Sequence, residues 1–167
     1  MIRAEQPGDE DAIRSITDQA FATAVHSSGT ESKIVDALRQ AGALTVSLVA
    51  VADHASESQL FGHIALSPVS LSDGTDGWYG LGPVSVLPAQ QRNGVGSALV
   101  RAALQNLRET GAAGCVLLGD PDYYGRFGFR PIDSLVLPGV PAEYFQAIRF
   151  SATVPTATVS YHVAFDM

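Results

Sequence analysis

The chain has 167 residues, 46% of them hydrophobic, and a formal net charge of −7. This length and composition suit one globular domain with its own core, and no run approaches the roughly 18 apolar residues of a membrane-spanning helix. The excess of acids argues against nucleic-acid binding, and the amino-terminal residues lack the apolar core of a signal peptide. We therefore expect one cytoplasmic domain over residues 1–167 that binds neither nucleic acid nor membrane.

Two further features of the composition bear on function. Eleven of the seventeen acids lie between Glu5 and Asp76, whereas the stretch 77–108 holds three arginines and no acid. This distribution suits an anionic ligand on the arginine-bearing stretch and a cationic one elsewhere, with chance clustering as the alternative. The one cysteine, Cys115, lies in an apolar run and is expected to be buried. It can form neither an internal disulfide nor a metal site.

The first third of the chain predicts one short strand and two helices. The strand covers residues 2–5. Asp9 stands where it can cap a helix over 10–21, whose apolar residues recur on one face. A second helix is expected to begin near residue 31 and to stop by Gly42.

The rest of the chain predicts a β-meander followed by a crossover. Three strands come first, and the third ends at Pro88 because proline cannot continue a ladder. An amphipathic helix and a wholly apolar strand follow, and then a short helix and two strands that complete the sheet. These segments are 44–52, 60–71, 78–87, 97–110, 115–119, 121–127, 135–137 and 158–165. This order predicts an α/β fold with a mixed sheet and one right-handed parallel crossover.

One segment between a predicted strand and helix carries the strongest chemical signal, Gln91-Arg92-Asn93-Gly94-Val95-Gly96. The first N–H groups of a helix lack intrahelical partners and lie at the positive end of its dipole. Two glycines leave room for a phosphate there, and an arginine adds positive charge. We interpret the segment as a pyrophosphate cradle. Glycines that serve only the turn are the alternative, and the Gly-Lys-Ser/Thr of a P-loop is missing.

The same segment resembles the Gln/Arg-x-x-Gly-x-Gly/Ala signature of the GNAT N-acetyltransferases. Gly82-Pro83-Val84-Ser85-Val86-Leu87-Pro88 before it looks like that family's fourth strand, and Tyr124-Gly125-Arg126-Phe127-Gly128-Phe129 after it is similar to the family's Tyr-x-x-x-Gly-Phe. The order of elements is also the family's, so the resemblance covers nearly the whole chain. Segments 81–84, 119–124 and 159–165 resemble more narrowly the YhbS-like subgroup.

The resemblance implies a fold and a cofactor. The fold is a GNAT-like mixed, mostly antiparallel sheet with helices on both faces and a splayed parallel strand pair that holds acetyl-CoA. In the family, pantetheine enters this gap, which implies backbone contacts from Val84, Ser85 and Val86. Strand alternation would send the two valines to one face and Ser85 to the other. The remaining implied cofactor-binding residues are Gln91, Arg92, Asn93, Gly94, Val95, Gly96, Ser97 and Phe127.

The resemblance also implies a catalytic acid. Tyr124 aligns with the tyrosine that protonates the leaving thiolate, and a phenol of pKa ~10 is protonated at neutral pH. A core tyrosine is the alternative, and Tyr123 takes the role if the register is off by one. Many family members carry a glutamate base on the fourth strand or act through a water, and an amine that arrives neutral needs no base. Strand 78–87 contains no acid, and His63 is the candidate general base. Glu31 and His26 are alternatives, and a purely structural His63 also stays open.

The function that these residues imply is acetyl transfer from acetyl-CoA to a primary amine, in a small molecule or peptide, by direct attack in a ternary complex. No metal is implied. A non-catalytic acyl-CoA-binding module and a binder of another nucleotide phosphate are the alternatives, and a homodimer through an edge strand stays open. The family's usual asparagine after the fifth strand is absent, so Asp120 or backbone groups would replace one pantetheine contact.

Overall fold

The computed structural model describes residues 1–24, 27–54 and 57–167. A six-stranded sheet forms its centre, in the order β1-β2-β3-β5-β6-β8, and β5 and β6 are its parallel pair. The strands are β1 (Ile2–Ala4), β2 (Val46–His54), β3 (Glu57–Pro68), β5 (Trp78–Val86), β6 (Gly114–Leu118) and β8 (Phe145–Arg149). The prediction of a mixed, mostly antiparallel sheet is confirmed.

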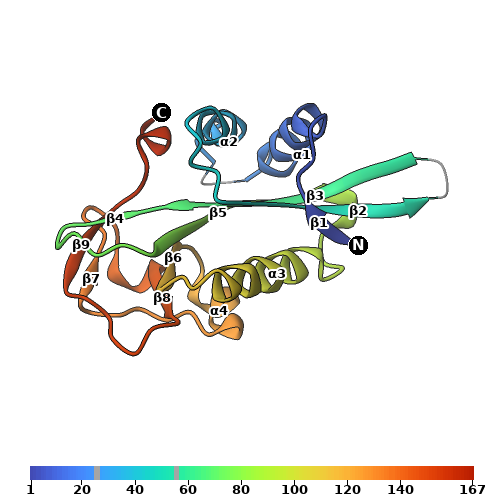
Figure 1. Ribbon diagram of the computed structural model, residues 1–167. Helices are drawn as coiled ribbons and strands as arrows, with labels where there is room; N and C mark the ends of the chain where they lie inside the picture. The colour runs from blue at the N-terminus through green and yellow to red at the C-terminus, as the bar shows by residue number, and fades with distance from the viewer. Residues whose placement is uncertain (25–26, 55–56) are drawn as a thin grey trace.

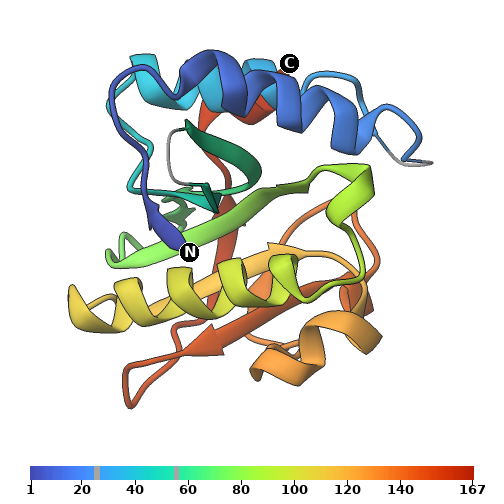
Figure 2. The same cartoon turned by 90° about the vertical axis from the view of Figure 1, so that its right-hand side faces the viewer.

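Helices cover both faces of this sheet (Figure 1). On one face lie α1 (Glu10–Phe21) and α2 (Glu31–Gln40), and on the other lie α3 (Val95–Glu109) and α4 (Pro121–Tyr124), as the turned view in Figure 2 also shows. Four 3-10 helices lie in the connections and near the carboxyl end: η1 (Pro88–Gln90), η2 (Gly125–Phe127), η3 (Ala142–Tyr144) and η4 (Val163–Asp166). Among the described residues, no helix has the length and apolar character needed to cross a membrane.

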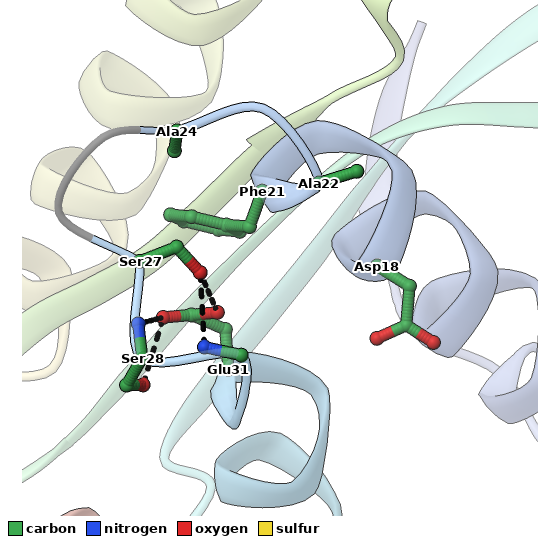
Figure 3. A pocket seen from close by; sticks show the side chains of 8 residues that line it. Asp18, Phe21, Ala22, Ala24, Ser27, Ser28 and Glu31 are labelled. Atoms are coloured by element: carbon green, nitrogen blue, oxygen red, sulfur yellow. Dashed lines mark hydrogen bonds between the residues drawn. The ribbon is translucent and has the colours of Figure 1, made fainter.

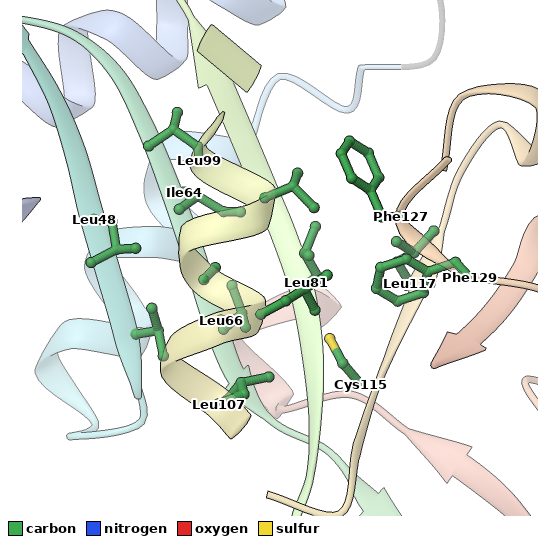
Figure 4. Close-up of a cluster of buried hydrophobic side chains, with 14 of the residues drawn as sticks. Leu48, Ile64, Leu66, Leu81, Leu99, Leu107, Cys115, Leu117, Phe127 and Phe129 are labelled. Atoms are coloured by element: carbon green, nitrogen blue, oxygen red, sulfur yellow. The ribbon is translucent and has the colours of Figure 1, made fainter. Parts of the chain in front are cut away.

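The largest core cluster lies between α3 and the sheet (Figure 4). The buried residues of α3 recur at helical spacing, as the sequence predicts: Leu99, Val100, Ala103, Leu104 and Leu107. They face buried side chains of four strands, among them Leu48, Ile64, Leu81 and Leu117. Each fully buried leucine stabilises the fold by roughly 1.5–3 kcal/mol. Cys115 is buried in this cluster without a disulfide, as expected, and burial raises the pKa of its thiol.

The parallel pair β5–β6 separates along its length. Only Trp78, Tyr79 and Gly80 of β5 pair with β6, and the pairing of these two fully described strands goes no further. On its other side β5 carries a bulge, because Gly82 and Pro83 lie opposite the single residue Ala65 of β3. A bulge bends its strand and increases the local twist. The predicted splay is therefore present, and it starts where the bulge turns β5 away from β6.

The prediction for the end of the sheet is wrong. Segments 135–137 and 158–165 do not complete the main sheet. They contribute β7 (Leu135–Val136) and β9 (Ala157–Ser160) to a second sheet with β4 (Ser70–Leu71), and the chain then turns into η4. The sixth strand of the main sheet is β8, which the sequence analysis did not identify. Its apolar pattern is broken by Gln146, a buried polar residue whose Nε2 donates to the carbonyl of Gly119.

The prediction that Asp9 caps α1 is also wrong. Asp9 has helical dihedrals, and its side chain makes no cap hydrogen bond. Its carboxylate instead accepts from the Arg3 guanidinium at 2.7 and 3.3 Å and from the N–H of Gln6 at 2.8 Å. The bond from Arg3 holds the pKa of this carboxyl below its ordinary value. Asp9 therefore ties β1 to the start of α1, because a charged partner outcompetes the free N–H groups of the first turn.

Candidate active site

The loop between β5 and α3 encloses an open pocket of about 410 Å³. Gly94 precedes the helix with a φ of 81°, a left-handed conformation that favours glycine. The helix consequently begins at Val95, two residues earlier than predicted. The pocket is lined by the first helical residues Val95, Gly96 and Ser97, whose N–H groups have no intrahelical partners. The positive end of α3 therefore faces this pocket.

Tyr123 forms the wall of the pocket opposite Gly96. A Cβ on Gly96 would lie 3.4 Å from the Tyr123 hydroxyl and 3.9 Å from Cγ2 of Val86, which are ordinary contacts. A side chain at position 96 would therefore fit without a clash, but it would fill part of the pocket. The Tyr123 hydroxyl lies 3.3 Å from Oγ of Ser97, and the Arg126 guanidinium lies over the Tyr123 ring at 4.4 Å. Tyr123 and Arg126 line the pocket and were missing from the predicted cofactor-binding residues.

The rest of the cradle segment divides into pocket and support. Arg92 lines the pocket, with an exposed side chain and a φ of 67°. Gln91 also lines it, and its Nε2 donates to the carbonyl of Val86 at 3.0 Å, so the side chain fastens the loop to the end of β5. Asn93 is exposed and Phe127 is buried in the core, and neither lines this pocket. Two guanidinium groups and a helix end thus make the pocket electropositive.

The pairing of β5 with β3 decides which peptide groups of β5 are free. The N–H of Leu87 donates to the carbonyl of Phe61 at 2.9 Å. In an antiparallel ladder, successive residues bond alternately toward and away from the neighbouring strand. Ser85, two residues before Leu87, therefore also bonds toward β3. Val84 and Val86 turn their peptide groups toward the gap with β6, so two of the three predicted residues offer backbone to that gap.

The side chains of the same three residues alternate as predicted. Val84 and Val86 pack against the cluster beneath α3. Ser85 is buried on the opposite face, where its Oγ lies 3.4 Å from Oγ1 of Thr17 in α1. The end of β5 therefore presents an apolar surface on the α3 side and a buried hydroxyl on the α1 side.

Tyr124 lies on α4, directly after β6. Its ring packs edge-on against Tyr123 with centroids 4.9 Å apart and also contacts Phe129. A Cβ on Gly119 would come within 2.6 Å of Cε2 of Tyr124, so glycine at this position makes room for the ring. Burial raises the pKa of Tyr124 to about 12. Its hydroxyl therefore stays protonated at neutral pH and can donate.

The Asp120 carboxylate serves the local helix. Its Oδ1 accepts from the N–H of Asp122 at 2.9 Å and caps α4. Gln146 of β8 lies nearby: its Nε2 donates to the carbonyl of Gly119 at 3.0 Å, while its Oε1 is buried without a partner among the described residues. Gln146 thus brings an amide to the end of β6, near the position where the family's asparagine is absent. No local pattern pointed to Gln146, because the sequence did not predict β8.

His63 lies on the other side of the sheet, beneath α1 and α2. It pairs in register with Ser85 of β5 and Val49 of β2, so the three side chains share one face. The ring is fully buried, and Nε2 lies 2.8 Å from Oγ of Ser47. Burial lowers the pKa of His63 to about 4, against the opposing influence of the Glu5 carboxylate. His63 is therefore neutral at neutral pH and is separated by the sheet from the cradle pocket.

A second pocket, of about 350 Å³, lies between the end of α1 and the start of α2 (Figure 3). Glu31 belongs to its wall but is occupied, since its carboxylate accepts from Oγ of Ser27 at 2.8 Å and from the N–H and Oγ of Ser28. Burial alone would raise the pKa of Glu31, but these bonds outweigh it and lower the pKa. Glu31 thus braces the loop before α2. The alternative base His26 lies outside the described residues.

Comparison with known proteins identifies the family. The profile of the acetyltransferase (GNAT) domain matches residues 45–131. The uncharacterized N-acetyltransferase YhbS of Escherichia coli K12 is 38% identical over 130 residues, which cover 78% of this chain and 73% of YhbS. A GNAT family acetyltransferase from Brucella melitensis, solved in complex with acetyl-CoA, is 49% identical with a TM-score of 0.87 and covers 99% of this chain and 97% of its own. Escherichia coli YhbS, solved in complex with CoA, also has a TM-score of 0.87 at 35% identity, over 100% of this chain and 92% of its own. The chain described here belongs to the GNAT family of N-acetyltransferases.

Proposed function

We propose that residues 1–167 form one N-acetyltransferase domain that moves the acetyl group of acetyl-CoA to a primary amine by direct attack in a ternary complex. One observation carries the proposal: the free edge of β5 runs straight into the electropositive pocket at the start of α3. A long ligand with an amide-bearing arm and a pyrophosphate fits that combination. The complexes of similar proteins with acetyl-CoA and with CoA support it.

The pocket and the strand edge would hold the two halves of the cofactor differently. The free N–H groups of Val95, Gly96 and Ser97 would donate to the pyrophosphate, while Arg92 and Arg126 supply positive charge. The peptide groups of Val84 and Val86 alternate donor and acceptor along the gap, as an added strand requires. Because Gln91 already occupies the Val86 carbonyl, that carbonyl would have to exchange the side chain for a pantetheine amide.

The chemistry would take place where β5 and β6 part. An N–H of β5 just after the bulge would polarise the acetyl carbonyl, and positioning of the amine would supply much of the rate. Tyr124 would give its phenol proton to the departing thiolate. His63, neutral and facing the α1–α2 side, would take the proton of the attacking nitrogen. The amine would approach from that side, because the cofactor occupies the α3 side.

A binding test and a turnover test separate this function from its alternatives. Calorimetry with acetyl-CoA, CoA, ATP and NAD should show binding of the first two and none of the others. Thiol release should then appear with at least one member of a broad amine panel. Binding of acetyl-CoA without thiol release from any amine would replace the enzyme with a non-catalytic acyl-CoA-binding module. Binding of ATP or NAD with equal affinity would contradict the cofactor assignment.

A further inference from the structure

A chain of hydrogen bonds links His63 to Ser47, Glu5 and Arg39. His63 Nε2 lies 2.8 Å from Oγ of Ser47 in β2, and this hydroxyl donates to Oε1 of Glu5 at 2.9 Å. Arg39 of α2 grips both oxygens of Glu5, with Nη2 at 2.7 Å and Nε at 3.0 Å. Each of these side chains is at least partly buried. The chain therefore joins the middle of the sheet to α2 through fixed, short contacts.

The chemistry of this chain fixes the tautomer of His63. A carboxylate can only accept, so the single hydroxyl hydrogen of Ser47 must go to Glu5. The contact between Ser47 and His63 then needs a hydrogen from the ring, which places the proton on Nε2. The neutral imidazole has only one such proton, so Nδ1 carries a bare lone pair. Arg39 keeps Glu5 ionised: burial alone would raise the pKa of Glu5, but the bonds from Arg39 and Ser47 outweigh it and lower the pKa.

The bare Nδ1 is buried and has no hydrogen-bond partner among the described residues. A buried acceptor without a donor costs free energy, so its persistence calls for a reason such as strain, an unseen water or a catalytic role. The ring lies directly across from Ser85, whose neighbours Val84 and Val86 form the free edge of β5. The His63 ring thus belongs to the residue that pairs with the strand that would position the acetyl group.

We propose that Ser47 and Glu5 are positioning residues for acetyl transfer, which hold His63 as the Nε2–H tautomer and stabilise the charge it gains when Nδ1 takes a proton from the attacking amine. This inference rests on the proposed function. The amine nitrogen bonds to the acetyl carbon as the carbon–sulfur bond breaks. The amine proton passes to Nδ1, directly or through one water, and Tyr124 supplies the proton of the thiol. Solvent then takes the proton from His63 and restores that of Tyr124.

The arrangement follows the logic of a carboxylate that orients a catalytic histidine and stabilises its imidazolium, here with a serine hydroxyl between them. The Glu5 carboxylate favours the protonated ring, against burial and against Arg39, which disfavour it. Removal of Ser47 would leave Nε2–H without an acceptor and would let the proton move to Nδ1. Nδ1, the nitrogen that is proposed to accept the amine proton, would then be a donor and could no longer act as a base.

The tautomer can be measured without any substrate, by ¹⁵N NMR of the full chain labelled at histidine. At neutral pH, His63 should show a protonated Nε2 and a bare Nδ1, and Ser47→Ala should lose this pattern. Turnover of Ser47→Ala should fall ~10-fold or more, less than the ~10²–10⁴-fold typical of loss of the general base itself, because the His63 ring remains. The KM for acetyl-CoA should change little. Ser47→Thr keeps the hydroxyl and should restore both readouts. Ser67→Ala removes a fully buried hydroxyl of β3 that has no hydrogen-bond partner among the described residues, and it should change neither readout.

The outcomes separate this inference from the proposed function. A protonated Nδ1 in the unmutated protein, or normal turnover of Ser47→Ala, would overturn the inference while acetyl transfer stands. An equal loss of turnover in Ser67→Ala would also overturn it, because packing would then explain both losses. Failure of the unmutated protein to acetylate any amine would sink the proposed function, and the catalytic role of His63 with it, even if the tautomer is as expected.

Discussion

The two faces of the central sheet carry the two halves of the candidate site in different ways. On the α3 side, most of the pocket comes from nearly consecutive residues: a strand end, a left-handed glycine and the first turn of a helix, with Tyr123 and Arg126 as the opposite wall. On the α1–α2 side, His63 depends on Ser47 and Glu5, which lie on two other strands or next to them. The first half is built from backbone and the second from side chains. Substitutions in the pocket should therefore act on binding, and substitutions around His63 should act on chemistry.

The difference also decides what a sequence can reveal. A cradle within seven residues leaves a local pattern of glycines and an arginine, and helix-end physics interprets it. A hydrogen-bonded chain whose members lie 16 and 42 residues apart leaves no such pattern. It exists only once the register of β1, β2 and β3 is set, because that register decides which side chains share a face.

The largest expected effect lies at Tyr124 of α4, on the α3 side of the sheet. Tyr124→Phe keeps the ring that packs on Tyr123 and removes the proximate proton donor. Turnover should fall ~10²–10⁴-fold, as for loss of a general acid, with acetyl-CoA affinity nearly unchanged. Steady-state thiol release and calorimetry measure the two quantities. Normal turnover in Tyr124→Phe together with a loss in Tyr123→Phe would move the acid to Tyr123, whose hydroxyl lies beside Ser97.

The second effect concerns the α1–α2 face and its stability. The pKa of His63 falls from an ordinary 6.5 to about 4 on folding. The folded state thus favours the neutral ring, and this contribution is present above about pH 6.5 and lost as the pH falls toward 4. Its size is on the order of 3 kcal/mol. Urea unfolding at pH 7, 5.5 and 4.5 should show a smaller acid loss in His63→Gln than in the unmutated chain.

Glu5 and Asp9 also stabilise the fold less as the pH falls, over an overlapping and more acidic pH range, because the pKa values of both carboxyls are lowered in the folded state. The comparison between His63→Gln and the unmutated chain removes this shared part, since both chains keep the two carboxylates. If the free energy of unfolding fell equally with pH in the two proteins, burial would not hold His63 neutral. The ring would then not have the single proton that the Nε2–H tautomer requires.

The fold could be predicted from sequence up to β6, because each element there has a clear period and a clear stop. Beyond β6 the short helix over 121–127 was also predicted correctly, but β8, whose apolar pattern Gln146 breaks, was missed, and the carboxyl-terminal segment joins a separate sheet. Asp9 failed as a cap because Arg3, from another element, claims its carboxylate. At Gln146 and at Asp9 a tertiary polar contact overrode a local preference, and such contacts are invisible before the elements are placed.

The third effect tests the backbone-built face. Gly96→Val puts a branched side chain into the pocket, where a Cβ would meet only ordinary contacts from the protein. The chain should therefore fold, while acetyl-CoA binds at least tenfold more weakly, about 1.4 kcal/mol. Ala98→Val adds a branched residue at an exposed position of the same helix outside the pocket and is the matched control. If the folded Gly96→Val and Ala98→Val proteins bound acetyl-CoA with equal affinity, the pyrophosphate could not lie at this helix end.

The smallest effect lies on the rim of the same pocket, at Arg92. Its side chain is exposed, so its attraction for a phosphate is worth only roughly 0.2–1 kcal/mol and is screened by salt. Arg92→Gln should weaken acetyl-CoA binding a few-fold at low ionic strength and hardly at all near 1 M salt, where the screening length shrinks to about 3 Å. Arg101→Ala is the control, because the Arg101 side chain extends from α3 over the ring of Phe127 and does not line the pocket.

A loss of affinity that is the same at both salt concentrations would mean that Arg92 acts through the shape of the loop rather than through its charge, since its backbone is left-handed. The α3 face would then bind its anion by backbone and by Arg126 alone.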